Sequence, residues 1–229
     1  MTNIGTYTDI PFTNIRTIIA NNMQNSLQSM AQVTNTASFD ATNILAQRKA
    51  NKQETNKKAD ITINDMILYA VSRTLKNFGD LNAHCLDKTI RQFDQVNLGM
   101  AVDTPRGLLA VTIYGADQLT LAGLSNEAKR LVVLAKEGRI MPDYLSGATF
   151  TVSNLGVFGT ESFTPIINAP QTGLLGVNTI KTNIKLVDGA IVPYQAIALS
   201  LTYDHRAVDG APAARFLQEL CQSLEKFEE

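Results

Sequence analysis

The chain has 229 residues, of which 45% are hydrophobic, and this is enough apolar material for one large domain or two small ones. Its 20 Lys and Arg residues nearly balance its 21 Asp and Glu residues, which leaves a formal net charge of −1. This balance excludes the broad basic surface by which proteins bind nucleic acid or anionic membranes. We therefore expect partners to be recognised at local sites.

The two cysteines, Cys85 and Cys221, lie far apart and have no cluster of metal-ligating residues beside them. This spacing argues against a disulfide framework and a zinc site, and it favours a reducing compartment. No run approaches the roughly 20 apolar residues that span a bilayer, and residues 1–9 form a polar lead without a signal-peptide pattern. The sequence predicts a soluble, cytoplasmic protein that binds no membrane, nucleic acid or metal.

The first quarter of the chain predicts helix, strand and helix. Apolar residues recur every three or four positions over residues 15–30, which predicts a helix with one buried face and Thr13 as its N-cap. Residues 33–39 predict a strand, and Asp40 is a suitable cap for a helix through about residue 52. Residues 49–60 are almost all polar or charged, and we expect an exposed, mobile loop inside the domain.

The remaining chain alternates between helix and sheet patterns. Apolar spacing predicts a second helix from residue 64 to about Gly79, and another over residues 121–135 that Pro142 prevents from continuing. A last helix is predicted over residues 211–227. The predicted short strands lie at residues 90–93, 96–102, 108–113, 149–152, 172–177, 184–186, 191–194 and 196–202. Together these elements predict a single α/β domain whose sheet takes strands from both halves of the chain.

Residues 199–210 carry the most informative pattern, because an apolar strand runs into a polar turn with His205 and then opens a helix. Imidazole titrates near pH 6.5, so a histidine at the mouth of a strand can take a proton at neutral pH and return it later. Asp209, four residues on, could fix the turn or the ring. From the spacing alone, a structural or merely exposed His205 is the simpler interpretation.

Residues 204–210, Asp-His-Arg-Ala-Val-Asp-Gly, resemble the Asp-His-Arg-x-x-Asp-Gly signature of the lipoamide acyltransferases of 2-oxo acid dehydrogenase complexes. The His-x-x-x-Asp-Gly core of that family is shared with chloramphenicol acetyltransferase. Five further segments resemble the family in the family's own order, at residues 15–27, 64–66, 102–108, 150–156 and 163–171. The resemblance covers nearly the whole chain and implies one catalytic domain over residues 1–229, with no lipoyl or peripheral subunit-binding domain.

The resemblance implies transfer of an acyl group between S-acyl-dihydrolipoyl-lysine and coenzyme A. By it, His205 is the base that removes the thiol proton, Ser153 is the hydroxyl donor to the oxyanion, and Asp209 organises the active-site turn. A thiol with a pKa of about 8.5 lies roughly two units above imidazole, so full proton transfer costs about 2.7 kcal/mol. The attacked carbonyl oxygen becomes negatively charged and needs a prearranged donor.

Three alternatives stay open. In the first, His205 activates Ser153 for an acyl-serine route, although the attacking thiol is already an excellent nucleophile. In the second, the chain is a noncatalytic core or binding subunit, but such relatives typically lack the motif histidine. In the third, it is an acetyl-CoA-dependent O-acetyltransferase of a small molecule; the Asp-His-Arg opening and the Ser153 segment favour the lipoamide family instead.

The implied fold is a two-layer α/β (α+β) sandwich around a mixed β-sheet, assembled as a homotrimer in which His205 faces Ser153 of a neighbour. In this family such trimers build a 24-mer or 60-mer core, and the final apolar residues often join trimers. The implied partners are a lipoyl domain and the 2-oxo acid dehydrogenase and dihydrolipoamide dehydrogenase components. A helix face suitable for joining trimers comprises Leu217, Leu220, Leu224 and Phe227.

The sequence says less about which acyl group is transferred and about the residues that line the substrate channel. Segments such as residues 38–42 resemble acetyl-transferring members from Gram-positive bacteria, which points to a pyruvate or acetoin dehydrogenase complex. Val111 and the pair at residues 21–22 depart from residues that are common in the family, at positions that could affect the substrate channel or coenzyme A contacts.

Two further pairs of residues carry weaker signals. His84 and Cys85 are neighbours in sequence, and because such neighbours rarely face each other in a strand, we do not expect a catalytic pair. Arg16 and Arg206 could form ion pairs that hold the turn around His205.

Overall fold

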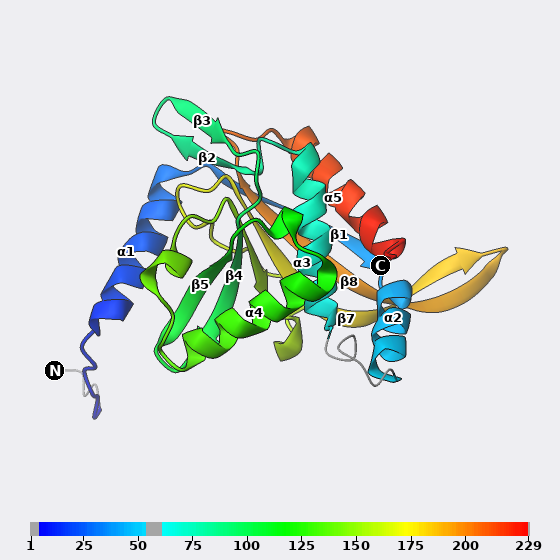
Figure 1. The fold of residues 1–229 in the computed structure, drawn as a ribbon, viewed down its shortest axis with the longest axis horizontal. Helices are drawn as coiled ribbons and strands as arrows, with labels where there is room; N and C mark the ends of the chain where they lie inside the picture. Colours follow the sequence, from blue (N-terminus) through cyan, green and yellow to red (C-terminus); the bar gives the residue numbers. More distant parts are fainter. Residues whose placement is uncertain (1–4, 54–60, 229) are drawn as a thin grey trace.

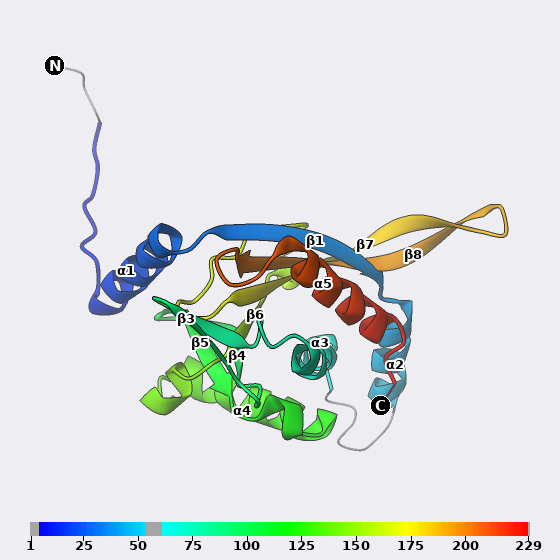
Figure 2. The ribbon, with the colours of Figure 1, turned by 90° about the horizontal axis from the view of Figure 1, so that it is seen from above.

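The fold is given by a computed structural model that describes residues 5–53 and 61–228. Six of the described strands form one mixed sheet in the order β1-β8-β7-β6-β4-β5, and β2 and β3 form a separate ribbon. Figures 1 and 2 show helices α3, α4 and α5 gathered on one face of the large sheet. The predicted two-layer arrangement around a mixed sheet is confirmed.

The strands and their pairing place the site. β7 pairs in parallel with β6, and β6 pairs in parallel with β4, whereas the other neighbours are antiparallel. The strands of the large sheet are β1 (Gln32–Asp40), β4 (Leu98–Thr104), β5 (Gly107–Ile113), β6 (Phe150–Asn154), β7 (Gly173–Val187) and β8 (Ala190–Asp204). The ribbon consists of β2 (Ala83–Leu86) and β3 (Thr89–Gln92).

The helices form where apolar residues repeat at helical spacing. Those described are α1 (Asn14–Ser29), α2 (Thr42–Gln53), α3 (Ile63–Thr74), α4 (Leu121–Lys136) and α5 (Gly210–Glu225). The short 3₁₀ segments of the same part of the chain are η2 (Leu75–Asn77), η3 (Ala116–Gln118), η4 (Pro142–Leu145) and η5 (Gly156–Phe158). The predicted cap Thr13 accepts a hydrogen bond from the Arg16 amide, at 3.3 Å.

The core lies between the sheet and helices α3, α4 and α5. Phe216 on α5 packs edge-on against Phe78 and lies 5.9 Å from the ring of Phe150 on β6. Full burial of one such side chain contributes about 1.5–3 kcal/mol. Alternate residues of β6 face this core, so Phe150 and Val152 are buried in it while Ser153 lies on the opposite face.

Helix α3 begins at a capping box that the sequence pattern did not identify. The Thr62 hydroxyl accepts from the Asp65 amide, and the Asp65 carboxylate accepts from the Thr62 amide. The helix ends at Thr74 and continues as η2, so Gly79 is not its C-terminal glycine. The predicted end was wrong because the chain tightens into a 3₁₀ turn before it reaches the glycine.

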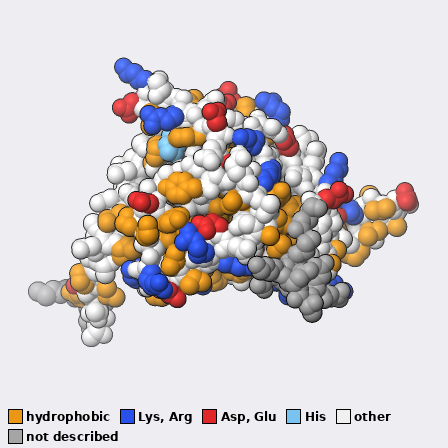
Figure 3. Space-filling view, viewed as in Figure 1, with side chains coloured by type: hydrophobic (Ala, Val, Ile, Leu, Met, Phe, Trp, Pro, Cys, Tyr) orange, Lys and Arg blue, Asp and Glu red, His pale blue; other side chains and the backbone are white. Residues whose placement is uncertain are grey.

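Strands β7 and β8 form one long hairpin rather than the four short strands that the sequence predicted. Val187 pairs with Ala190 across the two-residue turn Asp188-Gly189, whose φ values are 51° and 81°. Positive φ at both positions is typical of a type I′ hairpin turn. The tip of this hairpin projects from the body, as Figures 1 and 2 show, and its exposed apolar side chains are visible in Figure 3. We call residues 180–195 the outer hairpin.

Three further expectations need correction. The predicted face of α1 is only partly covered: Ile15, Ile19 and Met23 are half-buried and Met30 is buried, but Leu27 is 56% exposed. Residues 49–53 belong to α2, and the rest of the predicted loop, residues 54–60, lies outside the described residues. Strand β2 was missed, because a strand of only four residues leaves little periodicity to detect.

The face of α5 that was expected to join trimers is buried inside the chain. All four side chains belong to the core, packed toward the sheet and the neighbouring helices. They are therefore not available for contacts between trimers. The four are Leu217, Leu220, Leu224 and Phe227.

Within residues 5–53 and 61–228, no helix is both long enough and apolar enough to cross a membrane.

Candidate active site

His205 stands on a turn that is fixed at both ends by buried residues. Tyr203 and Asp204 end β8, Val208 is buried in the core, and α5 begins at Gly210. The imidazole lies 5.8 Å from the Tyr203 ring, centroid to centroid, and its side chain is 45% exposed. The turn therefore presents a half-exposed imidazole on a fixed base, at the mouth of a strand as predicted.

The side chain of Asp204 makes most of the hydrogen bonds that hold this turn. The carboxylate is fully buried and accepts from Arg206 Nε at 3.0 Å, from Arg206 Nη2 at 2.7 Å and from the Arg206 amide at 3.1 Å. Burial raises the pKa of Asp204, but the hydrogen bonds from Arg206 outweigh it and hold that pKa below its ordinary value. Arg206 thus has the ion-pair partner that the sequence could not name, whereas Arg16 is exposed on α1.

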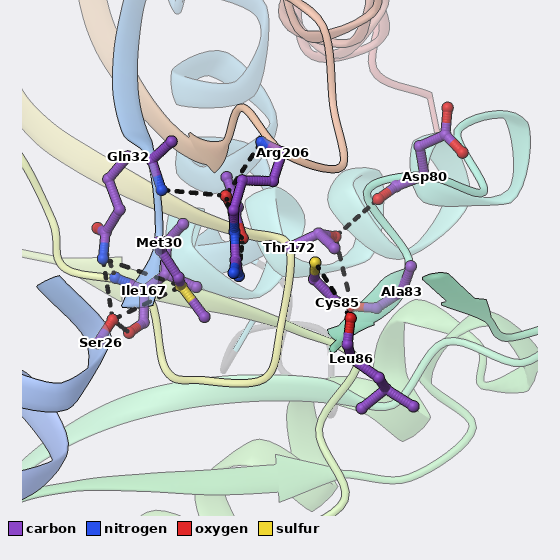
Figure 4. A network of polar contacts seen from close by, with 12 residues as sticks. Ser26, Met30, Gln32, Asp80, Ala83, Cys85, Leu86, Ile167, Thr172 and Arg206 are labelled. Atoms are coloured by element: carbon purple, nitrogen blue, oxygen red, sulfur yellow. Dashed lines mark hydrogen bonds and ion pairs between the residues drawn. The ribbon is translucent and has the colours of Figure 1, made fainter. Parts of the chain in front are cut away.

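Backbone hydrogen bonds tie the turn to the start of β1. The His205 amide donates to the Ala31 carbonyl at 2.8 Å, and the Ala31 amide donates to Asp204 Oδ1 at 3.2 Å. The Asp204 amide donates to the Thr172 carbonyl at 2.9 Å. Figure 4 shows Arg206 in this network with Thr172 nearby, and the contact between Ser26 near the end of α1 and Gln32 at the start of β1. The main chain at His205 is therefore held from two sides.

Asp209 lies at the outer edge of the same turn. Its Oδ1 is 3.9 Å from His205 Nδ1, and its side chain is 85% exposed. It occupies the N-cap position of α5 with extended backbone angles but makes no side-chain capping bond. The hydrogen bonds of the turn go to Asp204, to which the sequence pattern assigned no role, so the organising role of Asp209 stays a prediction.

Ser153 lies near the end of β6 and is half-buried. It pairs with Gly176 on β7, and a side chain at Gly176 would meet the ring of Phe163 at 2.7 Å. Glycine at this position therefore lets Phe163 lie directly over the sheet beside Ser153. On the same face of β6, Thr151 donates to Gln171 at 2.7 Å.

The structure does not bring Ser153 and His205 together within one chain. The row of the sheet that contains Ser153 and Gly176 continues to Ser200 on β8, five residues before His205. Five residues of strand span about 16 Å, and the two strand spacings from β6 to β8 add about 10 Å sideways. A reaction centre that uses both side chains therefore needs a second chain.

His84 and Cys85 make separate contacts, in agreement with the expectation that they are not a pair. His84 Nε2 lies 2.9 Å from the Ala148 carbonyl, and its ring packs edge-on against Phe93. Burial raises the pKa of the Cys85 thiol, although the positive charge of Arg206 opposes the shift. Cys85 thus lies beside the Asp204–Arg206 pair as a protonated thiol.

Over residues 5–53 and 61–228, no three or more His, Cys, Asp or Glu side chains form a group that could hold a metal ion.

Comparison with known proteins places this geometry in a family. The chain matches the model of the 2-oxoacid dehydrogenases acyltransferase (catalytic domain) over residues 4–229. It is 36% identical over 218 residues to the dihydrolipoyllysine-residue succinyltransferase component of the 2-oxoglutarate dehydrogenase complex of Bartonella vinsonii subsp. berkhoffii, covering 94% of this chain and 53% of that one. It is 37% identical over 220 residues to the dihydrolipoyllysine-residue acetyltransferase component of the acetoin cleaving system of Bacillus subtilis, covering 95% and 55%. The chain thus spans about half the length of these relatives.

Solved structures of the same family superpose closely on this chain. The dihydrolipoamide acetyltransferase of Azotobacter vinelandii superposes with a TM-score of 0.94 at 35% identity, over 98% of this chain and 93% of that one. The cubic core of the pyruvate dehydrogenase multienzyme complex superposes with a TM-score of 0.93 at 36% identity, over the same shares. A chloramphenicol acetyltransferase, at a TM-score of 0.56 and 15% identity over 91% and 94%, shares the fold alone, as the resemblance implied.

The family match covers almost every residue, and its signature forms the fixed turn that presents His205. The chain therefore belongs to the family of 2-oxoacid dehydrogenase acyltransferase catalytic domains.

Proposed function

We propose that this chain transfers an acyl group between S-acyl-dihydrolipoyl-lysine and coenzyme A. The observation that carries the proposal is the half-exposed imidazole of His205 on a turn held from two sides, in a member of an acyltransferase family. A histidine presented in this way can take a proton at neutral pH and return it. Coenzyme A and lipoyl-lysine are both substrates here, and a lipoyl domain would deliver the second.

A solved relative supports the choice of residues. The Azotobacter vinelandii acetyltransferase was studied for the role of one serine, one histidine and one asparagine in its catalytic mechanism. Its serine and histidine are separated by the same number of positions as Ser153 and His205. Its asparagine follows the histidine by four positions, as Asp209 follows His205. Asp209 therefore stands where that enzyme has an uncharged amide.

In the proposed reaction, His205 takes the proton from the attacking thiol, and the thiolate attacks the thioester carbonyl carbon. The carbonyl electron pair moves to oxygen, where the Ser153 hydroxyl donates a hydrogen bond to the negative charge. The bond to the leaving sulfur then breaks, the carbonyl forms again, and the leaving thiolate takes the proton back from His205. Because the thiol attacks directly, no covalent bond to Ser153 is needed.

The separation of the two groups within one chain supports a site shared between subunits. We infer a homotrimer in which Ser153 of one chain lies opposite His205 of the next, so that each interface holds one site. The relative that forms a cubic core supports further assembly of trimers into a 24-mer; a 60-mer is the other arrangement of the family. The partners would be the lipoyl domain, the 2-oxo acid dehydrogenase and the dihydrolipoamide dehydrogenase, in the cytoplasm.

Acetyl is the acyl group that we propose, for a pyruvate or acetoin dehydrogenase complex. The relatives include both acetyl and succinyl transferases at nearly equal identity, so the family match alone does not select the group. The distinction depends on pocket shape, because succinyl adds bulk and a carboxylate that need room and a charge partner.

A coenzyme A assay with dihydrolipoamide and a panel of acyl-CoAs tests the proposal, with His205→Ala measured beside the unaltered protein. We expect acetyl-CoA to be the best donor and the variant to lose nearly all turnover. Wild-type turnover by His205→Ala would remove this residue from the mechanism. Transfer to a small alcohol but not to dihydrolipoamide would favour an O-acetyltransferase instead, and no transfer at all would favour a noncatalytic subunit.

A further inference from the structure

We propose that the Asp204–Arg206 pair is a positioning element for the base, and that it controls turnover by fixing the main chain of His205. The proposal rests on the proposed function, since it assigns the pair a role in that same site. The two acidic residues of the signature would thus have different roles. The buried Asp204 would hold the main chain of the turn, whereas Asp209 lies at its exposed edge.

The first support is the number of donors that converge on one buried carboxylate. Asp204 accepts from the Ala31 amide, from the Arg206 amide and from the Arg206 guanidinium, whose Nε lies 3.0 Å from both carboxylate oxygens. A buried charge is stable only when it is paired and hydrogen-bonded in this way. The carboxylate is therefore held in one orientation and can hold other groups in turn.

The second support is a closed pair of hydrogen bonds between Ala31 and the turn. Ala31 donates to the Asp204 side chain at 3.2 Å and accepts from the His205 amide at 2.8 Å. A shift of the carboxylate would displace Ala31, and Ala31 would displace the main chain at His205. A movement of about 1 Å at a reacting group can lower the rate roughly 100-fold.

The third support is the anchoring of Ala31 itself. Gln32 Nε2 donates to the Ser26 hydroxyl at 2.9 Å, and Ser26 donates to the Ile167 carbonyl at 2.6 Å. These contacts, drawn in Figure 4, fix the junction between α1 and β1 against the body of the domain. Ala31 is thus a stable reference point, and the Asp204–Arg206 pair connects the base to it.

If a buried ion pair has only a structural role, its loss should lower stability and leave turnover unchanged. The chain contains such a pair, which serves as a matched control for Asp204 and Arg206. Asp117 on η3 is also a buried carboxylate that accepts from a backbone amide, Val96 N at 2.9 Å, and pairs with a cation, Lys76 Nζ at 3.2 Å. Val96 leads into β4, and strands β6 and β7 separate β4 from β8 in the sheet order. Asp117→Asn should therefore lower stability as a broken buried pair does, with turnover unchanged.

The experiment measures kcat, KM for coenzyme A and thermal unfolding for four variants of the assembled enzyme: Asp204→Asn, Arg206→Gln, Arg206→Lys and Asp117→Asn. The Arg206 side chain is 45% exposed, so its variants should fold even if Asp204→Asn does not. We expect Arg206→Gln to lower kcat about 10- to 100-fold with KM nearly unchanged, as for a group that acts only on the reacting geometry. Arg206→Lys keeps the charge without the two-nitrogen fork and should recover part of the loss.

Two outcomes would overturn the inference: an Arg206→Gln enzyme that keeps wild-type kcat, or one whose kcat and thermal midpoint both match those of Asp117→Asn. His205→Ala is measured in the same series. If it is inactive while Arg206→Gln is fully active, the positioning role alone is lost. If His205→Ala itself retains wild-type turnover, the proposed function is at fault.

Discussion

Ser153 on β6 lies level with Ser200 on β8, and His205 follows Ser200 by five residues of strand and turn. The two proposed catalytic side chains are thus at different ends of the sheet in any one chain. This arrangement makes the proposed site depend on how chains are placed beside each other.

Mixed assembly should restore activity to two variants that are each strongly impaired. If Ser153→Ala chains and His205→Ala chains are unfolded together and reassembled in equal amounts, about one quarter of the interfaces pair an intact Ser153 with an intact His205. We expect about that fraction of wild-type activity from the mixture, against little from either variant alone. A mixture as inactive as its components, with co-assembly verified by light scattering and mass spectrometry, would mean that each site lies within one chain.

Removal of the Ser153 hydroxyl should weaken catalysis without abolishing it. Loss of one oxyanion donor commonly lowers kcat roughly 100- to 1000-fold, so Ser153→Ala should fall in that range with little change in KM. Ser162→Ala, exposed in the following loop, serves as the control and should behave as the unaltered enzyme. Acetyl label trapped on Ser153 in the wild type, or ping-pong kinetics, would instead support an acyl-serine intermediate.

Truncation of the buried face of α5 should destabilise the fold of each chain. Leu220 is fully buried against the core, so Leu220→Ala should cost about 2–5 kcal/mol in the free energy of unfolding. Chemical denaturation measures this loss, and Gln218→Ala on the exposed side of the same helix is the control. If Leu220→Ala dissociated the assembly while its chains stayed as stable as before, the helix would face a neighbouring subunit.

Acid should remove the contribution of the Asp117 carboxylate to the stability of the folded chain. Burial raises the pKa of this carboxyl, but the Val96 amide and the Lys76 ammonium hold the pKa below its ordinary value of 3.8. A lowered pKa in the folded state adds stability that is present above the unfolded-state value and is lost as the pH falls through the folded-state value. The stability difference between wild type and Asp117→Asn should therefore be full at pH 7 and shrink below pH 3.8. Asp103→Asn, an exposed carboxyl, is the control, and a difference that persisted in acid would contradict the assignment.

The sequence was sufficient for the elements whose burial is one-sided. Helix α4 was predicted almost to the residue because its apolar stripe faces the core and Gly138, at φ 72°, ends it. The outer hairpin was broken into pieces because both of its faces meet solvent, so no alternation marks it as strand. The exposure of α1 was not predictable either, since helical spacing of Ile15 and Ile19 does not show how much of that face will be covered.

Only part of the candidate site, like only part of the fold, could be predicted from the sequence. The strand, turn and helix that present His205 follow from a local pattern, whereas its role as a base was predicted from the family resemblance, because spacing alone favoured a structural or merely exposed histidine. The hydrogen bond between Ala31 and Asp204 joins positions 173 apart, and no local pattern records such a pairing. An acidic residue two positions before an arginine was the one available signal for the Asp204–Arg206 pair, and it did not show that the carboxylate is buried.

The sheet order also bears on synthesis of the chain. Strand β1 pairs along its whole length with β8 and with no other described strand. Because β8 is the last of the described strands in the chain, β1 leaves the ribosome long before its partner is made. Until β8 inserts between β1 and β7, both of those strands keep an open hydrogen-bonding edge that can capture another nascent chain. Fragments that stop before residue 190 should accordingly aggregate, and the turn that carries His205 should be completed only as the last strand and helix arrive.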